Sequence, residues 1–246
     1  MLQAPMMTNH NSYILHLLKE DLKNLVLLAE FVLYICEYFD ILKLESGLEE
    51  AYQYSSDYDA IIIANDSCYG PLKPLVNVFQ PMEYSDCDFW GLTVNQEIYL
   101  PHLQSYFLVF NKKIINSEIF RNFFRKVKRE DNKDNIIENY EIALTPNFID
   151  AGFKMDSFIK KIFERNPTLY DKLFFFLMKN DFPFFKVSSI ADQPKIKNEI
   201  FQNYLKNNDN LYKLVYRHSK RIEKKKSFKL NLLYNVCKIF SLNSIK

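Results

Sequence analysis

The stretch IIIANDSCYG (61–70) places polar residues directly after the most apolar predicted strand of the chain. Residues 60–64 are mostly isoleucine and are bounded by Asp59 and Asn65, which predicts a buried strand of a parallel sheet, apolar on both faces. In open α/β sheets, ligands bind beyond the carboxyl ends of such strands. Asp66 is therefore either a carboxylate of a ligand site or a residue that caps a turn, and this stretch alone favours neither.

Glu141 is a second candidate for chemistry. A helix turns by about 100° per residue, so Ile137, Leu144 and Phe148 share one face and Glu141 lies beside them. Burying an unpaired carboxylate is costly, and burial moves a carboxyl group toward the range in which it can act as a general base. Glu141 is either such a base or a structural carboxylate that a nearby lysine or backbone amide satisfies.

Four further candidates occupy two predicted strands, at 86–94 and 102–110, and each strand contributes two of them to one face: Asp88 with Trp90, and His102 with Gln104. If these strands end near the polar residues that follow 60–64, the four side chains line one pocket. Taken alone, His102 is more often a hydrogen-bonded histidine at a strand start than a ligand. Trp90, the only tryptophan, is by default a core residue.

Several classes of protein are excluded by missing motifs. The chain has no G-x-S-x-G, G-x-G-x-x-G, Walker or H-E-x-x-H motif, which argues against serine hydrolases, dinucleotide enzymes, P-loop nucleotide hydrolases and zincins. The four cysteines lie far apart without zinc-type spacing, which predicts reduced thiols in a cytosolic protein. No secretory signal is evident, and the longest apolar stretch, 25–36, falls short of the roughly 20 residues that span a membrane. The sequence predicts a protein that is soluble or lies on a membrane without crossing it.

The elements that must position the candidates alternate between helix and strand. Apolar residues recur at helical spacing in the first part of the chain, which predicts one or two helices over 12–38, capped by Ser12. Further strands are predicted at 86–94, 102–110 and 183–187. Further helices are predicted around 75–79, from Ser117, from near Asp134 toward Gly152 and after Ile196. Pro146 is predicted to bend or break the helix that contains it. This order predicts the α/β class.

Positive charge is concentrated near the end of the sequence. Residues 213–246 contain ten Lys/Arg against one acid, Glu223, in a chain whose net charge is +2. A basic and partly amphipathic segment at 213–240 predicts binding to an anionic membrane surface, and the alternative is a solvated helix. Nucleic-acid binding is not predicted, because the segment carries no recognised motif and the rest of the chain is net acidic.

Five blocks stand in consistent order between residues 57 and 190: YDAIIIANDSCYGPLKPL, DCDFWGLT, HLQSYFLVFNKKIINSEIF, NYEIALTPNFIDAGFK, and NPTLY followed by FPFFKV. Together they resemble the rhamnan synthesis protein F family, whose members are glycosyltransferase-like and are associated with rhamnose-containing cell-surface polysaccharides. The resemblance implies a GT-A-type fold, a mixed sheet flanked by helices, with a nucleotide-sugar donor and a growing glycan as acceptor.

The resemblance also implies roles for the candidates. Asn65-Asp66-Ser67 stands where GT-A enzymes present an aspartate-x-aspartate motif, so Asp66 would hold a divalent cation, Mg²⁺ or Mn²⁺, beside the donor diphosphate; one carboxylate is compatible with Mg²⁺. Gly70, before Pro71, would let the chain turn beside the sugar nucleotide. Glu141 would be the base that takes the proton from the acceptor hydroxyl. The cleft for acceptor and donor sugar would be lined by Asp88, Trp90, His102 and Gln104.

The beginning of the chain departs from the family pattern. Residues 38–52 resemble a worn form of a tyrosine-aspartate-phenylalanine-glycine-type motif, and the retained Asp40 would contribute to donor binding. Residues 1–56 are interpreted as an atypical helical segment in place of the usual nucleotide-binding start, 57–190 as a GT-A-like core, and 191–246 as a helical basic extension. This start predicts slow sugar transfer by the isolated chain.

The predicted function is that of an inverting glycosyltransferase. It would move rhamnose or another deoxyhexose from a nucleotide sugar to a lipid-linked glycan, in the cytoplasm and peripherally on the inner face of the cell membrane. The alternative is a truncated or non-catalytic relative that serves as a partner subunit or remains as a remnant.

Overall fold

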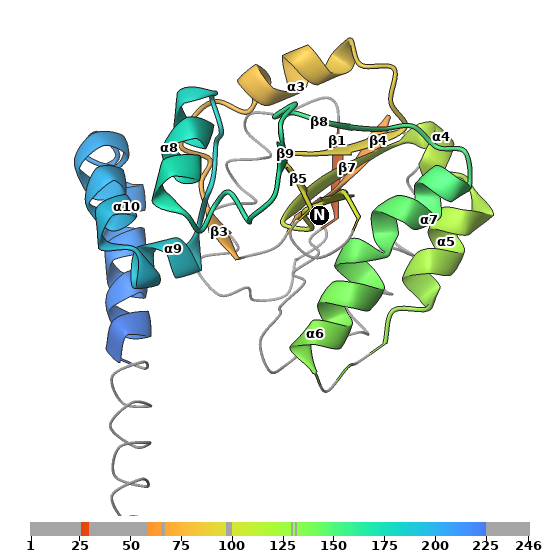
Figure 1. Ribbon diagram of the computed structural model, residues 1–246. Helices are drawn as coiled ribbons and strands as arrows, with labels where there is room; N and C mark the ends of the chain where they lie inside the picture. The colour runs from red at the N-terminus through yellow and green to blue at the C-terminus, as the bar shows by residue number, and fades with distance from the viewer. Residues whose placement is uncertain are drawn as a thin grey trace, which may run out of the picture. The chain divides into compact units, whose positions relative to one another are not determined.

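The computed structural model describes residues 26–29, 59–64, 67–96, 100–128, 130 and 132–224. The chain divides into two compact units, residues 1–186 and 187–246. The first unit combines helices with mixed sheets, which confirms the α/β class (Figure 1). None of the helices in these residue ranges is both long and apolar enough to cross a bilayer.

A five-stranded sheet forms the centre of the first unit, in the order β1-β2-β7-β4-β8. Its strands are β1 (Val26–Ala29), β2 (Ala60–Ala64), β7 (Phe107–Asn111), β4 (Phe89–Gly91) and β8 (Met155–Ser157). β1 is parallel to β2 and β4 is parallel to β8, whereas β7 runs antiparallel between β2 and β4. The four parallel strands therefore end at one edge of the sheet, and β7 begins there.

Strand β1 corrects the prediction of helix over 12–38, because Val26 pairs with Ala60 and Ala29 with Ile63 in parallel register. The sequence VLLA fits a buried strand as well as a helix, since a short apolar run carries no decisive periodicity. Pairing with β2 settles the conformation of these four residues. The remainder of the predicted N-terminal helical segment lies outside the described residues.

The predicted strands at 86–94 and 102–110 are each divided in two. After β4 and before β7, the chain leaves the central sheet to form β5 (Val94–Asn95) and β6 (His102–Leu103), which pair with each other. β5 also pairs with β9 (Ile162–Phe163) in a second small sheet. A third sheet joins β3 (Cys68–Tyr69) to β10 (Phe185–Lys186), so the predicted strand at 183–187 is confirmed in part.

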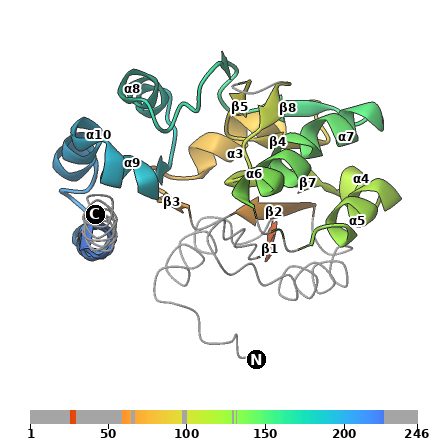
Figure 2. The same cartoon turned by 60° about the horizontal axis from the view of Figure 1, so that its bottom comes forward.

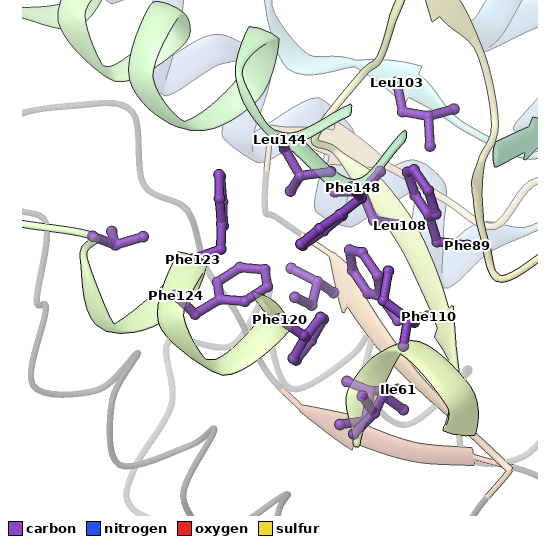
Figure 3. Packing of buried hydrophobic residues seen from close by; sticks show 14 of the residues in the cluster. Ile61, Phe89, Leu103, Leu108, Phe110, Phe120, Phe123, Phe124, Leu144 and Phe148 are labelled. Atoms are coloured by element: carbon purple, nitrogen blue, oxygen red, sulfur yellow. The ribbon is translucent and has the colours of Figure 1, made fainter. Parts of the chain in front are cut away.

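Helices cover one face of the central sheet with phenylalanines (Figures 1 and 3). Buried side chains of α4 (Lys112–Ile115), α5 (Glu118–Arg125) and α7 (Leu144–Asp150) form this layer, and the phenylalanines come from α5 and α7. Tyr140 of the π-helical turn η2 (Ile137–Ile142) packs against it, whereas α6 (Lys133–Ile136), which leads into η2, has no buried side chain. The helix predicted from Ser117 is α5, and Ser117 caps it by accepting a hydrogen bond from Phe120 N at 3.2 Å. Phe148 packs edge-on against Phe89 and Phe110, with ring centroids 5.5 Å and 6.0 Å away. This cluster fixes α7 against the sheet.

The opposite face packs against α3 (Val76–Glu83) and α8 (Asp171–Lys179). Ile61 and Ile63 belong to the first cluster and Ile62 to the second, and none of the three is more than 1% exposed. The prediction of a strand buried on both faces at 60–64 is therefore confirmed, but the prediction of a parallel sheet is wrong, because β2 is parallel to β1 and antiparallel to β7.

The second unit is helical, as predicted for the residues after Ile196. It contains α9 (Val187–Asp192), α10 (Pro194–Glu199), the π-helical turn η3 (Ile200–Tyr204) and a helix over 209–224 (Figure 2). Its buried apolar side chains are Ile190, Ile196, Ile200, Leu205, Leu211 and Val215.

Candidate functional site

Polar side chains gather at the edge of the sheet where the parallel strands end. Thr93 follows β4, and the segment from Gln104 to Tyr106 leads into β7. Thr93 Oγ1 donates to Gln104 Oε1 at 2.8 Å and lies 2.6 Å from the Tyr106 hydroxyl. Because the single Thr93 proton goes to Gln104, the Tyr106 hydroxyl donates to Thr93. All three side chains are buried, so this chain of hydrogen bonds fixes the two segments to each other.

Tyr106 lies where the surrounding segments meet. Burial raises the pKa of its phenol well above the ordinary value; the Thr93 hydrogen bond opposes this rise, whereas Cys68 and Glu141 add to it. The phenol therefore stays protonated at neutral pH and keeps its donor role. Cys68 belongs to β3 and Glu141 to η2, so both of these elements lie near Tyr106.

Glu141 reaches this edge from the π-helical turn. One of its carboxylate oxygens accepts hydrogen bonds from the Ser105 hydroxyl and, at 3.3 Å, from Ser105 N. Its side chain keeps 18% of its surface exposed. Thr145, four residues further on, accepts from Leu103 N at 3.0 Å and so ties the helix to the same segment. The carboxylate is held in place by donors that leave it partly open to solvent.

Pro146 was predicted to bend or break its helix, and the irregularity that the structure shows there is a π-helical turn just before it. The chain remains helical across Pro146, and i→i+5 bonding, such as Ala143 N to Glu138 O at 3.1 Å, replaces α-helical bonding just before it. Proline lacks the amide that would bond the carbonyl four residues earlier, and a widened turn accommodates that loss. π-Helical turns are frequent at functional sites.

His102 is buried beside Glu141. Its Nδ1 lies 2.9 Å from the carbonyl oxygen of Leu100, which can only accept, so Nδ1 carries a proton. Nε2 consequently faces Glu141 Oε1, at 3.9 Å. The structure thus brings together three of the predicted side chains, His102, Gln104 and Glu141, at one edge of the sheet.

Lys186 adds a positive charge to this edge. It pairs with Cys68 across the β3–β10 sheet, and its Nζ lies 5.7 Å from the centre of the Tyr106 ring. Within the described ranges, no carboxylate forms an ion pair with Lys186. Ser67 immediately precedes Cys68 and is half-buried. Ser67 therefore lies three residues after the end of β2, and Lys186 pairs with the residue that follows Ser67.

Gly70 is required by close packing. Its φ is +143°, and a Cβ at this position would lie 2.6 Å from both the Phe184 ring and the Pro183 carbonyl oxygen. Leu72 N donates to the same carbonyl at 2.7 Å. The glycine lets the chain after β3 pass closely beside the segment that leads into β10.

Asp88 lies at the opposite edge of the sheet, which corrects the expectation that it shares a pocket with His102 and Gln104. It precedes β4, and its carboxylate accepts from Lys154 N at 2.9 Å and from Lys113 Nζ at 3.0 Å. Burial would raise the pKa of this carboxyl, but these hydrogen bonds outweigh burial and lower it. Alternation along a strand defines its faces but not which end a residue occupies, so the sequence pattern could not place Asp88.

Trp90 is a core residue, the default interpretation of its sequence. Only 7% of its surface is exposed, and its ring packs edge-on against Phe79 with centroids 5.3 Å apart. It lies on the face of the sheet covered by α3, so it does not join the polar group at the edge.

The remaining predicted donor and metal residues, Asp40, Asn65 and Asp66, lie outside the described part of the chain. Among the residues that are described, no three His, Cys, Asp or Glu side chains come together as a metal site. Sequence reasoning missed Thr93, Ser105, Tyr106 and Lys186. Ser105 carried one signal, since it interrupts an otherwise apolar face between Leu103 and Phe107.

One comparison with known proteins identifies a family. The rhamnan synthesis protein F family matches residues 8–242. The uncharacterized protein y4gN of Sinorhizobium fredii (strain NBRC 101917 / NGR234) is 31% identical over 114 residues, which is 45% of this chain and 30% of that protein. The chain thus matches less than a third of that relative's length. No solved structure matches the chain. Because the family match covers nearly the whole sequence, the chain belongs to the rhamnan synthesis protein F family, a family of polysaccharide synthesis.

Proposed function

We propose that the chain is an inverting glycosyltransferase of GT-A type that extends a lipid-linked, cell-surface polysaccharide at the cytoplasmic face of the membrane. The observation that carries this proposal is Glu141, held by Ser105 at the carboxyl-end edge of the sheet and still partly exposed. Membership of the rhamnan synthesis protein F family supplies the substrate class, a nucleotide-sugar donor such as that of rhamnose.

The sheet supports a ligand site at this edge. In open α/β sheets, ligands bind in the crevice beyond the carboxyl ends of the strands. Here β2 and β4 end on either side of the start of β7, and the segments that follow them carry Ser67 and Thr93. A mixed sheet with one antiparallel strand between parallel ones is consistent with a GT-A-like fold.

Glu141 is proposed as the general base. Its carboxylate would take the proton from an acceptor hydroxyl as that oxygen attacks the anomeric carbon of the donor sugar. The bond between this carbon and the diphosphate oxygen breaks, and the diphosphate leaves with the electron pair. Attack from the face opposite the diphosphate inverts the anomeric configuration. Ser105 holds one carboxylate oxygen, and His102 Nε2 faces the other at 3.9 Å.

Charge on the departing diphosphate has to be neutralised. Asp66 is proposed to hold Mg²⁺ or Mn²⁺, with phosphate oxygens and water as the other ligands; bound there, the cation would act as a Lewis acid. Lys186 is proposed to contribute a second positive charge, since its ammonium group lies beside Tyr106 and its backbone pairs with Cys68. The buried hydrogen bonds among Thr93, Gln104 and Tyr106 would keep this wall of the site rigid.

A non-catalytic relative that serves as a partner subunit is the second candidate. The observation that favours it is the same hydrogen bond from Ser105 N to Glu141, because a purely structural carboxylate is satisfied in this way. The two candidates differ in ligand binding, since a subunit without a donor site gains no stability from sugar nucleotides.

A thermal-melting screen against sugar nucleotides, with and without Mg²⁺ or Mn²⁺, tests the proposal. We expect at least one sugar nucleotide to raise the melting temperature in a metal-dependent way, and Asp66→Ala to abolish this rise. Asp86→Ala is the matched control, because the Asp86 side chain is 93% exposed and pairs with Lys154. Sugar nucleotides that leave the melting temperature of the wild-type chain unchanged would favour the non-catalytic candidate. Unchanged metal-dependent binding by Asp66→Ala would remove Asp66 from the site.

A further inference from the structure

The helix over 209–224 buries an apolar stripe. Leu211, Val215 and Ser219 recur every four residues and are no more than 2% exposed. The sequence predicted that a basic, partly amphipathic segment at 213–240 binds an anionic membrane surface, and residues 213–224 of that segment are described. Since that stripe is already buried, any membrane contact in this part of the chain must use the other side of the helix.

That other side begins with an aromatic cluster. Tyr212 and Tyr216 are 37% and 46% exposed, and their rings stack with centroids 6.3 Å apart. Phe201, from η3, packs edge-on against both rings, at 5.1 Å and 6.3 Å. Large exposed aromatic rings gathered in one place commonly mark an interaction surface.

Basic side chains continue the same exposed side. With about 100° per residue, Tyr212, Tyr216, Lys220, Lys213 and Arg217 fall within about 140° of helix surface. Lys220 Nζ lies 5.8 Å above the centre of the Tyr216 ring, and the side chains of these three basic residues reach solvent.

Acidic residues offset part of this charge. Asp209 stands at the start of the same side of the helix. Glu223 accepts from Lys197 and from Lys220 Nζ, the latter at 3.1 Å. Over residues 187–224 the sequence has eight Lys/Arg against four Asp/Glu, and residues 225–246 add five lysines and no acid. The second unit is therefore cationic.

We propose that Phe201, Tyr212 and Tyr216, together with Lys213, Arg217 and Lys220, form an aromatic–basic surface that binds an anionic lipid bilayer. Tyrosine is suited to the lipid–water interface because its ring is apolar and its hydroxyl is polar. Lysine and arginine are attracted to the negative potential of anionic headgroups, and their attraction falls as salt screens it. The positive charge complements anionic headgroups, and the exposed tyrosine pair beside it favours a lipid surface as the occupant. This inference stands independently of the proposed transferase activity.

Co-sedimentation of the full chain with vesicles tests the surface. We expect binding to phosphatidylcholine vesicles that contain phosphatidylglycerol, much weaker binding to pure phosphatidylcholine, and loss of binding as NaCl rises. Lys213→Gln/Arg217→Gln should lower the partition coefficient about tenfold, because each basic residue near the bilayer contributes severalfold. Lys172→Gln/Lys179→Gln is the matched control, since these lysines are exposed on α8 in the other unit and remove the same charge.

The tyrosines are tested by Tyr212→Ala/Tyr216→Ala, for which we expect a loss of about threefold or more in partitioning. Circular dichroism checks that Tyr212→Ala/Tyr216→Ala keeps its helices. If this variant loses them, Lys213→Gln/Arg217→Gln still tests the surface independently. Unchanged partitioning of Lys213→Gln/Arg217→Gln would overturn the proposal. So would a wild-type chain that binds poly-uridylate RNA but not anionic vesicles, because the surface would then serve nucleic acid.

Discussion

Two carboxylates, Asp88 and Glu141, occupy opposite edges of the same sheet and differ in their partners. Asp88 precedes β4 and receives a backbone amide and a lysine ammonium, so its charge is neutralised locally. Glu141 lies where β7 begins and receives two donors from one neutral serine. Asp88 keeps 8% of its side-chain surface exposed and Glu141 keeps 18%.

The difference shows why residue type alone does not identify a functional carboxylate. A carboxylate paired with a cation is stabilised in its charged form, so it is a weaker proton acceptor. A carboxylate held by neutral donors at an edge open to ligands retains the capacity to accept one. The structure therefore favours a structural role for Asp88 and supports the proposed catalytic role for Glu141.

The largest expected effect comes from Glu141→Gln. Glutamine keeps the size and can still accept from Ser105, but it cannot take a proton from the acceptor. We expect transfer of the sugar, or its slower hydrolysis, to fall by about 10²-fold or more, with little change in melting temperature. Glu138→Gln, an exposed residue of the same π-helical turn, is the control. Equal turnover by Glu141→Gln and wild type would contradict the role of general base and would leave Glu141, like Asp88, a structural carboxylate.

Asp88→Ala should act on stability instead. Removing the carboxylate leaves the Lys154 amide and the Lys113 ammonium without their acceptor, and we expect a loss of about 2 kcal/mol in the free energy of unfolding, measured with urea. Asp86→Ala, which breaks only an exposed ion pair, should change this quantity by less than about 1 kcal/mol. A stable Asp88→Ala variant that fails to bind the donor would place Asp88 among the functional residues.

Ser105→Ala should produce a smaller loss of activity than Glu141→Gln. It removes the hydroxyl that holds Glu141 but leaves the Ser105 amide in place. We expect kcat to fall about tenfold while KM for the donor stays the same, because one hydrogen bond to a charged group is worth about 1.5 kcal/mol or more. Ser105→Thr should restore most of the rate. An equal change in KM and kcat would indicate a general structural defect.

Acid should affect stability through Asp88. Its pKa in the folded chain lies below the ordinary value, so the stability that it contributes is present above about pH 4 and is lost as pH falls through the folded pKa. Asp88→Asn should therefore flatten the decline in unfolding free energy below about pH 4. Urea titrations at a series of pH values measure this. Parallel pH curves for variant and wild type would contradict the assignment.

Strong local patterns made part of the fold predictable. Residues 60–64 were predicted to be a buried strand because a short run of consecutive apolar, mostly β-branched residues is typical of a strand that is covered on both faces. Ser117 marked the start of α5, since a serine before an amphipathic stretch is a common cap. Residues 26–29 were predicted wrongly because VLLA fits two conformations, and only the partner strand β2 selects one.

The candidate site depended on long-range contacts that no local pattern reveals. Ser105 and Glu141 are 36 residues apart, and the π-helical turn that aims Glu141 has no simple sequence signature. Lys186 reaches the edge through pairing of β10 with β3, which joins distant parts of the chain. Helical periodicity predicted that Glu141 lies on an apolar helix face, but it could not predict that Glu141 contacts Ser105.

Hydrogen–deuterium exchange with the sugar nucleotide that stabilises the chain most, in the presence of Mg²⁺ or Mn²⁺, tests most directly which edge of the sheet binds substrate. If the carboxyl-end edge is the site, ligand should slow exchange in peptides that contain residues 67–73, 100–106 and 184–186. Peptides that contain residues 86–88, 112–113 and 152–154, around Asp88, should exchange at the same rate with and without ligand. Protection confined to the peptides around Asp88 would contradict the proposed site.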